Sequence, residues 1–264
     1  MSSTATDSSI EEFTQRFAFR EDRKLFVGVE REGFLTKKSV IVPEAERVLT
    51  SLKRKQAGAQ FTYELSACQI EGHAGPCHID ALHEHLRITD TVLAEVLGEL
   101  GLRVLYTEVA PETIPLDVYP DPSGRYARLV EQMPRETLLA ACRVAGVHVH
   151  IGMPNRDAAL RAYNRAVGAC RHLIVHGDGS RGERLSLYEV VKPDFIPRTY
   201  ESWTDFHADA VKRGFDKNPR NNWDLIRISL HGTIEFRMFG TTDNLEVICE
   251  HARICHSMCA DAIR

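Results

Sequence analysis

Several segments alternate apolar and polar side chains, the pattern of a β-strand with one buried face. In residues 25–35, Val27, Val29 and Arg31 share one face, whereas Glu30 and Glu32 share the other. This pattern, together with short apolar runs, predicts strands at residues 25–35, 61–70, 103–108, 144–153, 225–230 and 233–239. His231-Gly232 separates the last two strands and predicts a tight hairpin turn.

A period of 3.6 residues predicts helices at residues 43–55, 79–100, 156–175 and 245–263. Pro43 suits a first helical position, and Gly101 suits a helix end. Frequent glycines and prolines predict a long loop at residues 177–214, and loops of that length are usually functional. Hairpin strands mixed with helices predict an α+β fold with a mostly antiparallel sheet backed by helices.

Three of the predicted strands have one apolar face and one face with side chains suited to catalysis. His148 and His150 share a face of one strand, and Glu235 and Arg237 share a face of another. Each pair alone has an ordinary explanation, either the solvent face of an antiparallel sheet or a surface ion pair. Their joint occurrence with Glu30 and Glu32 favours a concave basin whose polar face forms a site.

Glu64 and Glu71 add two acids from the segment between the first strand and the long helix. Their odd separation places them on opposite faces of a regular strand, so a bulge or break is needed if both reach one site. By itself, Glu64 is better explained as a structural residue. Clustered carboxylates require counter-charge, and several carboxylates with one imidazole suit Mg²⁺ or Mn²⁺.

Five short motifs together resemble one enzyme family. They are G-V-E-x-E at 28–32, E-x6-E at 64–71, G-V-H-V-H at 146–150, W-D-x-x-R at 223–227 and T-I-E-F-R at 233–237. Their order is similar to that of the glutamate–cysteine ligase family, in its bacterial carboxylate–amine ligase branch, a relative of glutamine synthetase. The resemblance implies a basin of antiparallel strands that binds ATP and Mg²⁺ or Mn²⁺.

The resemblance also implies roles for individual residues. The implied metal ligands are Glu30, Glu32, Glu64, Glu71, His148 and Glu235. The implied nucleotide or phosphate contacts are His148, His150, Arg184 and Arg227. Glu235 and Arg237 would be catalytic, with Arg237 facing the transferred phosphate. Arg125 and Tyr126, in "GRYARL", resemble a segment near the acceptor site.

The activity implied is an ATP-dependent ligation of a carboxylate to an amine through an acyl phosphate, with small-molecule amino acid and amine substrates. Glutamate is the family's usual carboxylate. The chain is shorter than known family members, and an A-L-S-A-N-S-P-type stretch is replaced by residues 170–186. That stretch helps to build the substrate pocket in relatives, so the sequence does not identify the acceptor amine.

The composition of the chain limits the partners and the cellular location that we expect for the protein. The chain has 264 residues, 43% of them hydrophobic, and a net charge of −4, which disfavours nucleic acid and anionic membranes as partners. No apolar run reaches the roughly 20 residues that a membrane helix needs. Seven cysteines without a CxxC pair argue against disulfides and favour the cytoplasm. We expect a polar leader at 1–22, helical near Ile10, and one catalytic domain at 23–264, whose hydrophobic C-terminal helix could pair two copies.

Two alternative functions remain. A metal-dependent hydrolase would use His148, His150 and the acids around an activated water, and a non-catalytic nucleotide or metabolite sensor would keep the basin. The glycine-rich segment at 176–182 lacks the Gly-Lys-Ser/Thr of a phosphate-binding loop. Cys249, Cys255 and Cys259 could suggest zinc, but their helical spacing predicts small buried thiols.

Overall fold

One mostly antiparallel sheet forms the centre of the protein, as the sequence predicts. The computed structural model describes residues 3–264, with side chains from residue 9 onward. The strand order is β3-β4-β1-β6-β8-β7, with β2 and β5 also paired to β1. The strands are β1 (Val27–Lys37), β2 (Val40–Ile41), β3 (Phe61–Tyr63), β4 (Gln69–Cys77), β5 (Arg103–Leu105), β6 (Gly146–Gly152), β7 (Ile226–Ser229) and β8 (Thr233–Gly240).

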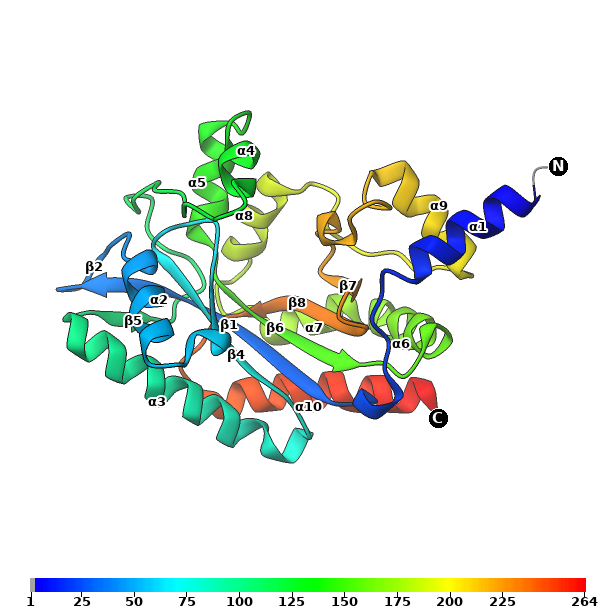
Figure 1. Cartoon of the computed structure of the whole chain (residues 1–264), viewed down its shortest axis with the longest axis horizontal. Coiled ribbons are helices and arrows are strands. Elements are labelled where there is room, and N and C mark those ends of the chain that lie inside the picture. The colour runs from blue at the N-terminus through cyan, green and yellow to red at the C-terminus, as the bar shows by residue number, and fades with distance from the viewer. Residues whose placement is uncertain (1–2) are drawn as a thin grey trace.

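Helices cover the apolar face of this sheet (Figure 1). Val29, Val149 and Phe236, which lie opposite one another on β1, β6 and β8, are almost completely buried. They share one core with helices on this side of the sheet. The covering helices are α3 (Leu82–Leu100), α6 (Arg156–Gly168), α7 (Cys170–Gly177) and α10 (Leu245–Ile263). The polar face is consequently left for the site.

The remaining helices stand at the two ends of the polar face (Figure 1). At one end lie α4 (Arg125–Val130), α5 (Arg135–Arg143) and α8 (Glu183–Val191); at the other lie α1 (Ser3–Thr14) and α9 (Trp203–Arg213). The chain also forms α2 (Ala45–Arg54) and short 3₁₀ turns at Glu21–Arg23, Gly58–Gln60, Ile79–Ala81 and Pro219–Asn221. The helices at the two ends border the polar face of the sheet on two sides (Figure 1).

Individual residues at the helix ends explain where two of the helices begin or stop. Gly101 ends α3 with a left-handed φ of 66°. The Asn244 side chain accepts hydrogen bonds from the first backbone N–H groups of α10. The buried thiols of Cys249, Cys255 and Cys259 line the core face of α10 and are free, so the prediction of core thiols is confirmed.

The prediction of one strand at 61–70 is wrong, because the chain breaks into β3 and β4. These two strands pair with each other, with Tyr63 opposite Ile70. Between them, the Ala67 N–H donates to Asp117 O at 2.8 Å. The intervening backbone therefore pairs with a distant loop instead of continuing the strand. This is the break that Glu64 and Glu71 need in order to reach one side.

The prediction of a long loop at 177–214 is also wrong, since it contains α8 and α9. Asp178 accepts hydrogen bonds from Ser180 N–H and Gly182 N–H, which turns the chain into α8. Ser202 caps α9 by accepting from Asp205 N–H. Of the glycines that suggested a loop, Gly177 ends α7, and Gly179 and Gly182 lie in the turn before α8. Two predicted helices also differ, because 156–175 divides into α6 and α7 at Ala169, and α2 begins after Pro43.

The N-terminal segment is helical from Ser3, earlier than predicted, and its aromatic side chains join the main core. Phe13 and Phe17 are at most 5% exposed and pack against Trp203 and Phe206 of α9. These rings fasten α1 to α9. Within the described residues, no helix has both the length and the apolar character needed to cross a bilayer.

Candidate active site

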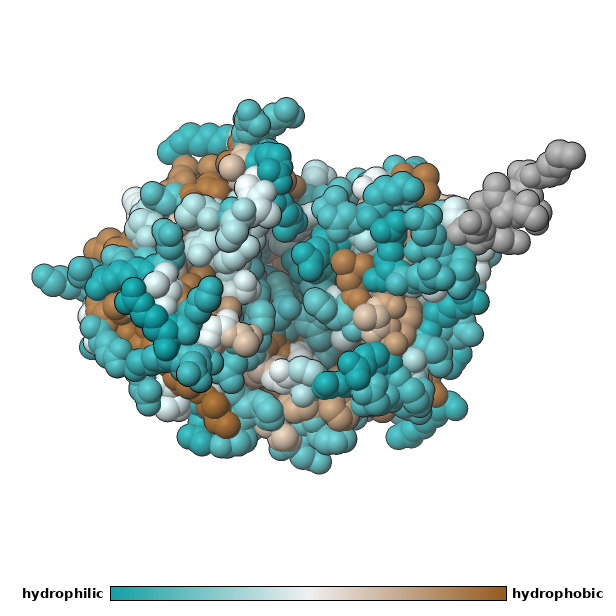
Figure 2. Space-filling model, in the orientation of Figure 1, coloured by the Kyte–Doolittle hydropathy of each residue, from teal (hydrophilic) through white to brown (hydrophobic). Residues whose placement is uncertain are grey.

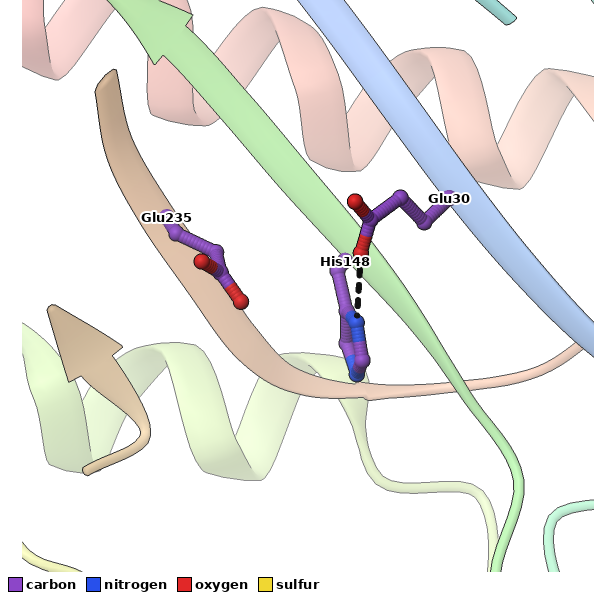
Figure 3. Close-up of side chains that lie close together, drawn as sticks. All are labelled: Glu30, His148 and Glu235. Atoms are coloured by element: carbon purple, nitrogen blue, oxygen red, sulfur yellow. Dashed lines mark hydrogen bonds and ion pairs between the residues drawn. The ribbon is translucent and has the colours of Figure 1, made fainter. Parts of the chain in front are cut away.

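The register of three neighbouring strands brings the predicted acids and imidazoles together. Glu30 of β1 lies opposite His148 of β6, and His150 of β6 lies opposite Glu235 of β8. The side chains of Glu30, His148 and Glu235 come from these three strands and gather on the polar face (Figure 3). His148 Nδ1 lies 3.1 Å from Glu30 Oε2, and His150 Nε2 lies 3.3 Å from Glu30 Oε1.

Glu235 is fully buried and is held by two arginines. Arg227 Nε donates to Glu235 Oε2 at 2.7 Å, and Arg237 Nη1 donates to Glu235 Oε1 at 2.6 Å. The Arg227 and Arg237 guanidinium groups and the His150 imidazole outweigh burial and hold the pKa of Glu235 well below its ordinary range. Glu235 is therefore ionised, and its charge is balanced within the site.

The second motif supplies Glu64 and Glu71, with one residue that the sequence analysis missed. Glu71 of β4 lies opposite Glu32, and the turn after β3 places Glu64 in the same cavity. His73 follows Glu71 by two residues on the same face, with His73 Nε2 2.7 Å from Glu71 Oε1. The E-x-H spacing on a strand was the available signal for His73.

The acids away from Glu235 have too little positive charge around them. Burial, together with the neighbouring carboxylates, raises the pKa values of Glu64 and Glu71 well above 4.5. Burial likewise raises the pKa of Glu32. Among Glu30, Glu32, Glu64 and Glu71, Glu30 alone has a depressed pKa, because His150 and His148 outweigh its burial. A divalent cation would supply the charge that these carboxylates lack.

The geometry of the cluster fits such cations. Three sets of ligand atoms each lie within 4.8 Å of one another, namely Glu30–His148–Glu235, Glu30–Glu71–His73 and Glu32–Glu71–His148. Carboxylate oxygens with one imidazole match the ligands of Mg²⁺ and Mn²⁺. Glu64 belongs to none of these sets. The predicted metal roles of the other acids and His148 remain proposals.

We predict that the metal-free protein loses stability as the pH rises above about 6.5, the ordinary pKa of a histidine side chain. Glu64 and Glu71 have raised pKa values in the folded state, so the folded protein binds more protons than the unfolded chain above pH 4.5. Glu30 and Glu235 raise the pKa of His150 above 6.5, so deprotonation of His150 also lowers the stability of the folded protein as the pH rises.

The measurement is thermal unfolding of chelator-treated protein across this range, repeated with Mg²⁺ or Mn²⁺. Cations that bind the ionised carboxylates should reduce or reverse the decline, because metal binding stabilises the folded state. A melting temperature that rises with pH in the metal-free protein would contradict the assignment.

A polar cavity of about 360 Å³, the main cavity, opens over the acids. Its lining includes Glu30, Glu32, Glu64, Glu71, His148, Arg125, Tyr126, Arg220, Arg227 and Arg237. It thereby collects most of the predicted site residues. Figure 2 shows a hollow near the middle of the face, bordered largely by hydrophilic residues. Arg220 and the aromatic residues Tyr63 and Trp223 also line it and were not predicted from sequence.

A second cavity of about 400 Å³ lies on the other side of Glu30. Its wall is more apolar and includes Phe26, Pro76 and Met153, together with Arg20 and Arg23. His150, a predicted nucleotide contact, lines this cavity instead of the main one. Two cavities thus meet at the carboxylate cluster.

Arg184, a predicted phosphate contact, is only 3% exposed and has main-chain partners. Its guanidinium donates to the carbonyl oxygens of Ala145, Arg237 and Met238 at 3.0–3.2 Å. These bonds fasten α8 to the start of β6 and the end of β8. In this structure the Arg184 side chain positions the strands.

Comparison with known proteins places the chain in a family. Residues 26–174 match the family model described as glutamate-cysteine ligase family 2 (GCS2), which is more than half of the chain. The chain therefore belongs to glutamate–cysteine ligase family 2. It is 35% identical over 153 residues to a Rhodococcus jostii protein named "putative glutamate–cysteine ligase 2-1", a match that covers 56% of this chain and 39% of that protein.

Solved structures show the same fold at low sequence identity. A bifunctional glutathione synthetase from Pasteurella multocida gives a TM-score of 0.59 at 11% identity, covering 98% of this chain and 40% of that one. A Plasmodium falciparum glutamine synthetase gives 0.52 at 11% identity, covering 98% and 54%. The chain spans about two fifths to one half of the length of the curated relatives it matches.

Proposed function

We propose that the protein is an ATP-dependent carboxylate–amine ligase that forms an amide bond through an acyl phosphate. The observation that supports this best is that two cavities meet at the carboxylate cluster, with Glu30 lining both cavities and Arg237 lining the main one. A ligase of this kind must bring a nucleotide and a carboxylate to one phosphoryl-transfer point. Membership of glutamate–cysteine ligase family 2 supports the same chemistry.

In this proposal, one group of residues binds the divalent cations and Arg237 contacts the transferred phosphoryl group. Glu30, Glu32, Glu71, Glu235 and His148 would hold divalent cations. When bound, these cations would neutralise the phosphate oxygens of ATP. Arg237 lines the main cavity and its buried Nε has no partner, so it can donate to the transferred phosphoryl group.

The two cavities suit different substrates. The apolar wall and the two arginines of the second cavity suit the base and phosphates of a nucleotide. The main cavity presents Arg125, Arg220 and Arg227, which suit an amino acid carboxylate such as that of glutamate. A carboxylate oxygen would attack the γ-phosphorus and release ADP. The amine nitrogen would then attack the acyl carbon and release phosphate.

The test is substrate-dependent ADP release from Mg²⁺–ATP, with glutamate and a pool of amino acids and amines. We expect ADP and phosphate to form together with an amide, which mass spectrometry would identify. With hydroxylamine in place of the amine, an acyl phosphate would be trapped as a hydroxamate. Amide hydrolysis without ATP would favour the metal-dependent hydrolase, and ATP binding without turnover in any pool would favour the sensor.

A further inference from the structure

A third cavity, of about 200 Å³, adjoins the main cavity and has no part in the function proposed above. We call it the side cavity and define it by Leu129, Met133, Val144, Val191, Tyr188 and Trp223. Glu64 and Arg237 line both this cavity and the main cavity. A group in the side cavity would therefore lie beside the point where the amide bond is proposed to form.

The walls of the side cavity are largely apolar, and several of their side chains are partly exposed to solvent. Leu129 on α4 is 38% exposed, and Met133, Val144 and Val191 are partly exposed. Burying such surface stabilises a complex by roughly 25 cal/mol per Å². An apolar cavity of about 150 Å³ is large enough to bind benzene. The side cavity therefore suits a leucine-sized or phenylalanine-sized group.

Most polar groups within the wall are already engaged. The Gln69 amide donates to Val144 O at 2.7 Å, and the Tyr188 hydroxyl donates to Trp223 O at 2.8 Å. The Arg184 guanidinium is held by the three carbonyls described above. Lys192, partly exposed just after α8, could pair with a carboxylate group of a ligand bound in this cavity. A polar side chain would find few partners in the cavity.

The side cavity has polar groups suited to an amine where it adjoins the main cavity. Glu32 and Glu64 lie there beside Arg237, and their carboxyl oxygens can accept hydrogen bonds from an amine or ammonium group. The arginines Arg125, Arg220 and Arg227 line the main cavity only, where they suit the carboxylate donor. The ligand that matches the side cavity thus has a cationic head and an apolar side chain.

On the basis of the proposed ligase function, we propose that the side cavity holds the side chain of the acceptor amine. The acceptor is an amino acid or amine with an apolar side chain, rather than cysteine. Tyr188 and Val191 follow closely after residues 170–186, the stretch that differs from the A-L-S-A-N-S-P-type pattern of the family. This departure and the apolar walls of the cavity agree with a change of acceptor.

The first test compares acceptors in the ADP-release assay, with glutamate and ATP constant. We expect kcat/KM for phenylalanine, leucine or phenethylamine to exceed that for serine or cysteine by about 10-fold or more. Val191→Asp should raise KM for phenylalanine by about 10-fold, a larger increase than it causes in KM for serine. The matched control is Val190→Asp, because Val190 is the neighbouring residue of α8, is 41% exposed and does not line the side cavity.

The second test measures binding without catalysis. The chain has two tryptophans, so Trp203→Phe leaves Trp223 of the side cavity as the only tryptophan, whose emission can be excited selectively. Phenethylamine and phenylalanine should change Trp223 emission with saturation, and Val191→Asp in the same background should weaken the response about 10-fold.

The outcomes separate the two proposals. A saturable response without ATP turnover would support the apolar binding site and contradict the ligase function. Turnover of serine or cysteine alone, with no Trp223 response to apolar amines, would support the ligase function and overturn the side-cavity proposal. Absence of both signals would overturn both proposals.

Discussion

Replacement of Glu30 by glutamine is expected to lower ATP-dependent turnover by roughly 1,000-fold. Glu30 belongs to two of the three ligand sets, so its carboxylate contributes to two of the proposed cation positions. It also lies within 3.3 Å of both His148 and His150. A neutral amide keeps the shape of the side chain but removes the charge that both imidazoles and the cations need.

The measurements are kcat/KM from ADP release and calorimetric titration with Mn²⁺. Mn²⁺ affinity should fall about 10-fold or more, together with turnover. Glu46→Gln is the matched control, because Glu46 is an exposed acid in the first turn of α2, outside the three ligand sets. Near-normal Mn²⁺ affinity and turnover in a folded Glu30→Gln protein would contradict the metal assignment.

Replacement of Arg237 by lysine is expected to lower kcat by about 100-fold to 1,000-fold, with a smaller change in the affinity for ATP. Arg237 bonds Glu235 through Nη1 while its buried Nε has no partner. A lysine can retain the ion pair, but it lacks the second donor of the planar guanidinium. The charge would be preserved and the fixed geometry would be lost.

The comparison of Arg237→Lys with Arg237→Gln separates geometry from charge. Gln should lose the ion pair with buried Glu235 and lower the melting temperature, whereas Lys should stay closer to the unmodified protein. Arg198→Lys is the control for an arginine outside the site, because Arg198 pairs with Asp205 at the surface. If Arg237→Lys raises KM for ATP without lowering kcat, Arg237 contributes to nucleotide binding and not to phosphoryl transfer.

Strand periodicity was the most informative sequence signal. The alternation in residues 25–35 and 144–153 predicted which face of β1 and β6 holds Glu30, Glu32 and His148, because a period of two fixes the face. Charge reasoning could also predict a cation site, since carboxylates on one face need neutralisation. The strand register then places these groups opposite one another.

The errors lie where distant segments determine the structure. The break after β3 depends on the Ala67–Asp117 backbone hydrogen bond, and no local pattern reveals that pairing. Helix α8 was mistaken for a loop because the glycines before it dominated the composition of the segment. Arg184 belongs to that helix, and its partners lie 39 to 54 residues away along the chain. The side cavity is likewise formed by residues that are not contiguous in the sequence.

The side cavity and the carboxylate cluster are built from different parts of the chain. Glu30, His148 and Glu235 lie on central strands, whereas Leu129, Met133 and Val191 lie on or beside helices at one end of the polar face. If the two proposals hold, mutations in these helices would alter the choice of acceptor while the strands keep the phosphoryl-transfer chemistry. Such a division makes the fold a practical scaffold for directed evolution, in which libraries confined to α4, α5 and α8 would sample new amide products.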